Sequence, residues 1–183
     1  MSPRAVVLVE GASDRVALET LARRFGHDLA AEGVAVVPIG GAQAIGRSLE
    51  RFRGVHVGGL CDAGEEPEFR RAFERAGIPA AFFVCEVDLE DELIRALGPA
   101  RVEEIVAENG DLASFRTLQN QAVWRDRPVR DQLRRFMGSG ARRKIRYAAL
   151  LVEALDLDCV PEPLAGVLRT HVRIMLGPSQ MDL

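Results

Sequence analysis

The sequence is poor in the residue types that build thiolate and imidazole metal sites. It contains three cysteines and three histidines among 183 residues. Cys61, Cys85 and Cys159 lack the paired spacing of a zinc site, and the first two lie inside apolar runs. We therefore expect small buried thiols in a reducing compartment rather than a disulfide or a zinc centre. For the three scattered histidines we expect surface or core-filling roles.

Several motifs are also missing. No Gly-x-x-x-x-Gly-Lys-Ser/Thr segment occurs, which excludes a P-loop ATPase in this chain, and the glycine pattern of dinucleotide-binding folds is absent. No apolar run approaches membrane-spanning length, and the first residues do not resemble a signal peptide. We expect a cytoplasmic protein without a membrane partner.

Apolar, β-rich runs alternate with helical patterns in the first half of the chain. The four runs are Ala5–Val9, Val34–Pro38, 55–61 and 80–85. Helical periodicity marks 13–25, where Ser13 is the predicted N-cap, and also 42–52 and 67–76. This alternation predicts a parallel sheet with crossover helices.

Strand signals end near Leu89. The remaining predicted helices cover Leu89–Leu97, 102–109, Val129–Met137, 141–155 and 163–176. The sequence therefore predicts an α/β core over residues 1–98 and an all-helical extension over residues 99–183.

Carboxylates follow three of the predicted strands. Glu10 follows the first strand, Asp62 the third, and Asp88 and Glu90 the fourth. Because the carboxyl ends of parallel strands share one edge of a sheet, these groups can converge despite their distance in sequence. Oxygen ligands without nearby His or Cys suit Mg²⁺ or Mn²⁺. Asp91 and Glu92, by contrast, are interpreted as first-turn residues that complement a helix dipole.

The charges are unevenly distributed. Residues 62–92 contain ten Asp and Glu against three Arg, whereas residues 116–146 contain ten Arg and Lys against two Asp. With a net charge of −3, nucleic-acid binding would depend on this local asymmetry. Two solvated faces would be the ordinary interpretation, but the acidic cluster falls at strand ends, where divalent cations are held.

The order of these motifs resembles a topoisomerase–primase (TOPRIM) domain, a Rossmann-like fold, in the version found in overcoming-lysogenization-defect (OLD) nucleases. The first motif is Val6-Val7-Leu8-Val9-Glu10-Gly11-x-Ser13-Asp14. It is followed by Gly40-Gly41, Gly59-Leu60-x-Asp62, Asp88-Leu89-Glu90 and Lys144-Ile145-Arg146-Tyr147-Ala148.

The resemblance implies a nuclease with a site for one or two Mg²⁺ or Mn²⁺ ions. The implied metal ligands are Glu10, Asp14, Asp62, Asp88 and Glu90. Lys144, with Glu10, is the implied catalytic residue and stabilises charge on the scissile phosphate. One departure is Gly64, which stands where these domains carry a second Asp. Either Glu65, one residue along, reaches inward in its place, or the second ion is held weakly.

Composition supports a special role for Lys144 independently, because it is the only lysine beside 23 arginines. A site that needs a compact ammonium would retain lysine, although chance survival explains one lysine about equally well without the motif. The predicted nucleic-acid-binding residues are Arg134, Arg135, Arg142, Arg143 and Arg146. Trp124 lies among arginines and could stack on a base, but packing within the extension is the favoured interpretation.

The sequence therefore favours a divalent-metal-dependent DNA nuclease. The alternative is a non-catalytic nucleic-acid-binding or regulatory module that partners a separately encoded ATPase, and Gly64 favours it. RNA cleavage or nucleotidyl transfer by the same site stays open. So do the number of metal ions and the oligomeric state, a homodimer included.

Overall fold

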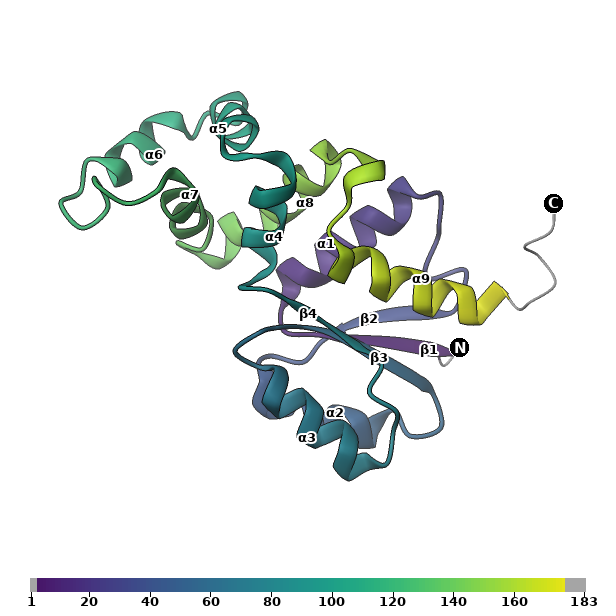
Figure 1. Cartoon of the computed structure of the whole chain (residues 1–183). Coiled ribbons are helices and arrows are strands. Elements are labelled where there is room, and N and C mark those ends of the chain that lie inside the picture. Colours follow the sequence, from purple (N-terminus) through teal and green to yellow (C-terminus); the bar gives the residue numbers. More distant parts are fainter. Residues whose placement is uncertain (1–2, 177–183) are drawn as a thin grey trace.

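A computed structural model of the chain describes the backbone of residues 3–176 and the side chains of residues 3–171. Its centre is a four-stranded parallel sheet in the order β2-β1-β3-β4 (Figure 1). The strands are β1 (Ala5–Val9), β2 (Val34–Pro38), β3 (His56–Asp62) and β4 (Phe82–Cys85). The predicted parallel α/β class is confirmed, and each strand lies within two residues of its predicted bounds.

Helices cover both faces of the sheet. The connections between strands contain α1 (Ala12–Arg24), η1 (Ala42–Ala44), α2 (Ile45–Arg51) and α3 (Glu66–Ala76). Along β1, Val7 and Val9 belong to one hydrophobic cluster, whereas Val6 and Leu8 belong to the other. This alternation follows from the strand period of two. Helices α2 and α3 cover one face, and α1 lies on the other (Figure 1).

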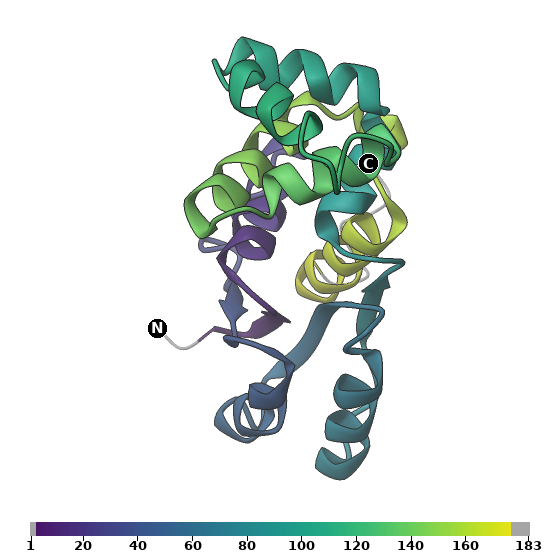
Figure 2. The same cartoon turned by 90° about the vertical axis from the view of Figure 1, so that its left-hand side faces the viewer.

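The rest of the described chain is helical. Its elements are α4 (Leu89–Leu97), α5 (Pro99–Glu108), α6 (Leu112–Gln119), α7 (Val129–Met137), α8 (Ala141–Ala154), η2 (Leu157–Cys159) and α9 (Glu162–Leu176). Helix α6 was not predicted. Figure 2 shows α5, α6, α7 and α8 stacked at one end of the molecule, with α2 and α3 at the other and the sheet between them.

The last two helices return to the sheet. Helix α8 packs along α1, where Arg24 Nη1 donates to the carbonyl oxygens of Val152 and Leu155 at 2.8 and 2.7 Å. Helix α9 packs on β1, β3 and β4. His171 lies directly over Gly58, where a Cβ would stand 2.1 Å from the imidazole ring. One hydrophobic cluster therefore joins both sides of the predicted boundary at residue 98, which itself stays a prediction.

All three cysteines are free thiols. Cys61 and Cys85 are buried as expected, but Cys159 is exposed because it ends the surface turn η2. Within residues 3–176, no helix combines the length and the apolar character needed to cross a bilayer.

Candidate functional site

The first carboxylates of the candidate site lie where β1 passes into α1. Glu10 directly follows β1, and Gly11, not Ser13, is the N-cap of α1. The prediction for Ser13 was wrong because the helix begins earlier, at Ala12, and places Ser13 inside its first turn. Asp14 performs the capping contact instead, with its Oδ2 accepting from the Gly11 N–H at 2.8 Å. This bond fixes the buried Asp14 carboxylate beside the end of β1.

Asp62 ends β3, the strand next to β1 in the sheet. Burial raises the pKa of its carboxyl to about 8, and the negative charges of Asp14, Glu10 and Asp88 add to that increase. These charges influence Asp62 because the parallel strands deliver them to one edge of the sheet. The structure therefore brings together the acids that follow β1, β3 and β4.

Glu65, the N-cap residue of α3, lies beside the same cluster of carboxylates. Burial raises the pKa of Glu65 to about 7. The negative charge of Glu10 and a hydrogen bond between the Glu65 and Glu10 carboxyl groups add to that increase. Its Oε2 is buried and has no hydrogen-bond partner among the described residues. A carboxylate beside Glu10 is thus present in this loop despite Gly64, although its role as a metal ligand stays a prediction.

Glu90 enters from the first turn of α4 and is only 6% exposed. Its Oε2 lies 3.5 Å from Nζ of Lys144, whereas its buried Oε1 has no hydrogen-bond partner within the described part of the chain. Burial raises the pKa of Glu90 to about 7 even though the ammonium of Lys144 opposes that increase. A buried carboxylate with an unused oxygen is costly unless a cation or a donor joins it.

Lys144 belongs to the first turn of α8, where its backbone N–H donates to Gly140 O at 2.9 Å. Burial alone would lower the pKa of its ammonium, but the nearby carboxylates of Glu90, Asp14 and Asp62 raise it overall. Lys144 therefore stays charged. Its compact ammonium lies near the carboxylates of Glu90, Asp14, Asp62 and Glu10.

Asp88 is held by protein groups on both of its oxygens. As the N-cap of α4 it accepts from the Asp91 N–H at 2.8 Å, and its other oxygen accepts from Arg134 Nε at 2.5 Å. These contacts orient the first turn of α4, on which Glu90 lies. Asp88 therefore positions the start of α4. Coordination of a metal by Asp88 stays a prediction.

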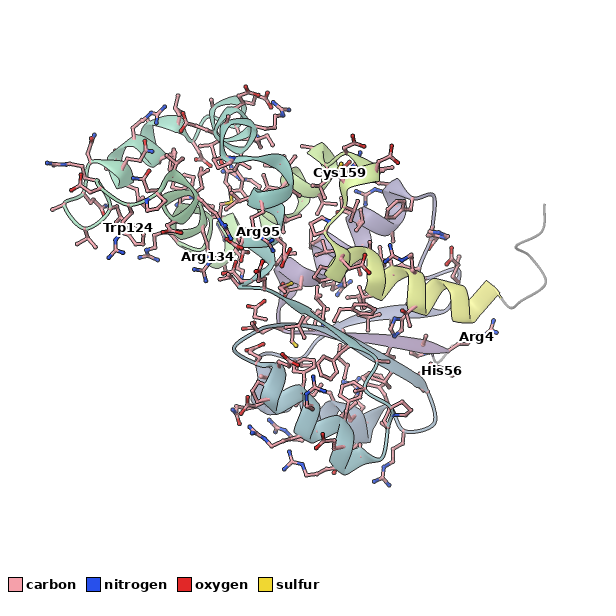
Figure 3. All side chains as sticks on the ribbon, in the orientation of Figure 1. Arg4, His56, Arg95, Trp124, Arg134 and Cys159 are labelled. Atoms are coloured by element: carbon pink, nitrogen blue, oxygen red, sulfur yellow. The ribbon has the colours of Figure 1, made fainter. Side chains whose placement is uncertain are left out.

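Asp91 and Glu92 are also buried, but they are fully partnered. Asp91 accepts from Arg130 and Arg95, while Glu92 accepts from the Glu86 N–H and pairs with Arg95. They thus do more than complement the helix dipole, since Asp91 joins α4 to α7 through Arg130. Figure 3 shows Arg95 and Arg134 near the junction of the sheet and the helical part.

The fit to a metal can be judged from the donor set. Among the described residues, no three His, Cys, Asp or Glu side chains are already arranged as a ready ligand cluster. The acids that converge are nevertheless all carboxylates, and Glu65 and Glu90 each carry a buried oxygen without a partner there. Hard oxygen donors crowded at raised pKa values suit a divalent cation of the Mg²⁺ type.

The five arginines predicted to bind nucleic acid have different surroundings. Arg134 pairs with Asp88, and Arg146 pairs with Asp111 and lies over the Tyr147 ring. Arg143 lies 4.2 Å from the centre of the Phe136 ring and donates to Ser139. Arg135 and Arg142 are exposed and form no ion pair within the described residues. The basic stretch therefore combines internal contacts with free cations.

Trp124 packs against the main hydrophobic cluster, as the favoured interpretation predicted, but it and Arg127 have a second environment. Both line a cleft that also contains Glu90, Lys144 and Arg134. The clustering of Trp124 with neighbouring arginines was the only signal in the sequence, because the cleft is formed by segments distant along the chain.

Comparisons with known proteins agree with this fold. Residues 3–63 match the family model described as overcoming lysogenization defect protein-like, TOPRIM domain. The fold is similar to the C-terminal region of the Xanthomonas campestris pv. campestris OLD protein, with a TM-score of 0.73, 18% identity and coverage of 95% of this chain and 94% of that one.

A second similar structure is the C-terminal region of the Burkholderia pseudomallei OLD protein, with a TM-score of 0.69 and 16% identity over 96% of this chain and all of that one. No curated protein matches the chain. Domains of this type are generally associated with nucleases and with divalent metals. The chain thus contains a TOPRIM domain that resembles that of the OLD family.

Proposed function

We propose that the protein is a divalent-metal-dependent nuclease that hydrolyses phosphodiester bonds of DNA. The observation that carries the proposal is the meeting of carboxylates at one edge of the sheet. Glu10 and Asp62 lie at the ends of two neighbouring parallel strands, and the buried Glu90 lies 3.5 Å from Lys144. Such crowding of acids at a sheet edge, opposite one ammonium, is expensive for folding and typical of a functional site.

The residues that would hold Mg²⁺ or Mn²⁺ are the acids without a full set of protein partners. They are Glu10, Asp14, Asp62, Glu65 and Glu90, with Asp88 orienting the last of them through the start of α4. A divalent ion there supplies a Lewis acid for the phosphoryl oxygen and a water of lowered pKa. Glu65 provides the carboxylate that Gly64 lacks, which supports a second ion.

Lys144 would act on the substrate through charge. Its Nζ lies 3.5 Å from Glu90 Oε2, so it is already at the carboxylate cluster and stays an ammonium. Positioned there, it stabilises negative charge that develops on the phosphate in the transition state. The exposed guanidinium groups of Arg135 and Arg142 would hold flanking phosphates, with binding that weakens as salt rises.

A plasmid nicking assay tests this function. The intact chain should convert supercoiled DNA to open or linear forms with Mg²⁺ or Mn²⁺ and should be inactive in EDTA. Asp62→Asn should abolish the activity, whereas Glu66→Gln should not, because Glu66 pairs with Arg70 on the surface of α3. Absence of nicking with either metal would overturn the proposal.

The second candidate is a non-catalytic module that binds nucleic acid and partners a separate ATPase. Two observations favour it: Gly64 at the position of the second Asp, and the engagement of both Asp88 oxygens by Asp91 and Arg134. It predicts DNA binding that is unchanged by Asp62→Asn, with no cleavage under any metal.

A further inference from the structure

A cleft of about 590 Å³ opens directly beside the carboxylate cluster. Glu90 and Lys144 line it, together with residues of α7 and of the segment between α6 and α7. Sites for small ligands usually have volumes of roughly 300–1,000 Å³. The cleft is therefore large enough for one nucleotide next to the proposed reaction centre.

Two exposed arginines of the cleft have no acidic partner among the described residues. Arg127 and Arg135 line it, are exposed, and form no ion pair or side-chain hydrogen bond among the described residues. Arg134 and Lys144, also in the wall, already pair with Asp88 and Glu90. Asp131 also lines the cleft, but the two unpaired arginines outnumber it, so the remaining charge is positive and suits phosphate.

Trp124, the only tryptophan of the chain, lies in the same wall. It is half-buried and packs against the main hydrophobic cluster. Its carbonyl oxygen accepts from Nε2 of the buried Gln132 at 2.7 Å, and Gln132 in turn accepts from Gln119 at the same distance. Trp124 is thus fixed from α6 and α7 rather than carried on a free loop; Figure 3 labels it beside Arg134.

The neighbouring Val123 is 70% exposed and lines the same cleft. The exposed Val123 and the part of Trp124 that the core leaves uncovered form an apolar surface among arginines. Such a surface matches the flat face of a nucleobase flanked by phosphates. Aromatic side chains stack on bases that are unpaired, because paired bases are covered by their neighbours.

We infer that this cleft binds an unpaired nucleotide, with its base stacked on Trp124 and its phosphates held by Arg127 and Arg135. This inference rests on the proposed nuclease function and assigns its substrate class, namely single-stranded or locally unpaired nucleic acid beside the scissile bond. Duplex DNA would enter only where a base leaves the stack.

Trp124 provides its own reporter, because no other tryptophan contributes to the fluorescence. The full chain is titrated in EDTA, without cleavage, with a 20-nucleotide single-stranded dT oligomer, the matching rU oligomer and a dA·dT duplex of the same length. We expect the emission to be quenched by one or both single strands, with affinity about tenfold higher than for the duplex. Unchanged emission at saturating oligonucleotide, measured in parallel by anisotropy, would overturn the inference.

Variants locate the contact. Trp124→Ala should weaken single-strand binding about tenfold, while Trp124→Phe keeps an aromatic face and should retain most of the affinity. Arg127→Gln should weaken binding and reduce its salt dependence, whereas Arg125→Gln, in the same segment but outside the cleft, should not. Single-strand affinity equal to the parent's in both Trp124 variants would contradict the cleft assignment.

The two proposals fail separately. If single strands quench the fluorescence but the protein never nicks DNA, the nucleotide-binding cleft is supported and the nuclease function is contradicted. If single strands do not quench the parent and Trp124→Ala nicks relaxed duplex DNA at the parent's rate, the nucleotide-binding cleft is contradicted and the nuclease function is supported.

Discussion

Two sets of buried acids share the first turn of α4, and the difference between them distinguishes a structural carboxylate from a functional one. Asp91 is surrounded by the guanidinium groups of Arg130 and Arg95, and Glu92 by Arg95 and a backbone N–H. Glu90, equally buried, has one ammonium at 3.5 Å and one oxygen without a partner in the described structure.

The same contrast extends across the sheet edge. Asp62 and Glu65 have raised pKa values, of about 8 and about 7, because burial and like charges are not balanced by protein cations. Partner number, rather than burial or residue type, therefore separates the acids that hold the fold together from those available to a ligand.

The largest effects are expected when one acid of each set is neutralised. Asp91→Ala should lower the free energy of unfolding by about 2 kcal/mol, because it separates α4 from Arg130 of α7, a loss reduced by the partial exposure of that arginine. Asp62→Asn should instead raise the free energy of unfolding in EDTA by about 1 kcal/mol by relieving repulsion, while it abolishes nicking. Urea unfolding and the nicking assay check both; equal destabilisation by the two variants would contradict the distinction.

Lys144 tests the chemistry of the same centre. Lys144→Ala should lower turnover about a hundredfold, because charge on the reacting phosphate loses its ammonium, and divalent-metal binding should survive. Lys144→Arg should restore little of the activity, since a guanidinium is wider and spreads its charge. The measurement is the nicking rate at saturating metal. An arginine variant as fast as the parent would show that the identity of the only lysine is unimportant.

Sequence patterns predicted most of this fold and the general position of the site. Strand bounds followed from apolar β-rich runs, and Glu10 and Asp62 were placed correctly at one edge because parallel topology leaves no other arrangement. Helix α6 was missed because it has eight residues, of which only Phe115 and Leu118 are buried, so its stability comes from packing on neighbours.

The remaining features depend on contacts between distant segments. Periodicity identified α8 and α9 but could not show that they return to α1 and to the sheet. The pairing of Arg134 with Asp88 spans 46 residues, and the proximity of Glu65 to Glu10 depends on where the loop after β3 turns. The predicted role of the arginines was likewise incomplete, because sequence does not show that Arg146 pairs with Asp111.

A smaller effect is expected in the basic stretch of residues 116–146. Arg142→Glu should weaken DNA binding several-fold for all sequences alike and reduce the salt dependence, because an exposed arginine without an ion pair among the described residues contacts only phosphates. Arg47→Glu, at an exposed arginine of α2 that likewise forms no ion pair among the described residues, is the matched control. Anisotropy titrations across a salt series measure the effect, and affinity indifferent to salt would assign the basic stretch to a protein partner.

The smallest predicted effect concerns pH and lies outside the site. Burial lowers the pKa of His171, whose ring lies over Gly58 and whose Nδ1 contacts the Val167 carbonyl at 2.7 Å. Its contribution to stability is complete above its unfolded pKa of about 6.5 and is lost as the pH falls below that value, since the unfolded chain then binds the proton more readily.

Urea unfolding at pH 7.5 and 5.5 measures this effect. The parent should lose about 1 kcal/mol more than His171→Leu over this interval. An identical pH dependence in the parent and His171→Leu would show that His171 does not contribute.

The central claim, that the under-partnered acids form a metal centre, is tested most directly by calorimetric titration of the intact chain with Mn²⁺. We predict binding at millimolar concentration or tighter that is lost in both Glu10→Gln and Asp62→Asn and retained in Glu66→Gln, whose parent carboxylate pairs with Arg70. No binding heat at millimolar Mn²⁺, or unchanged binding in Asp62→Asn, would contradict the account.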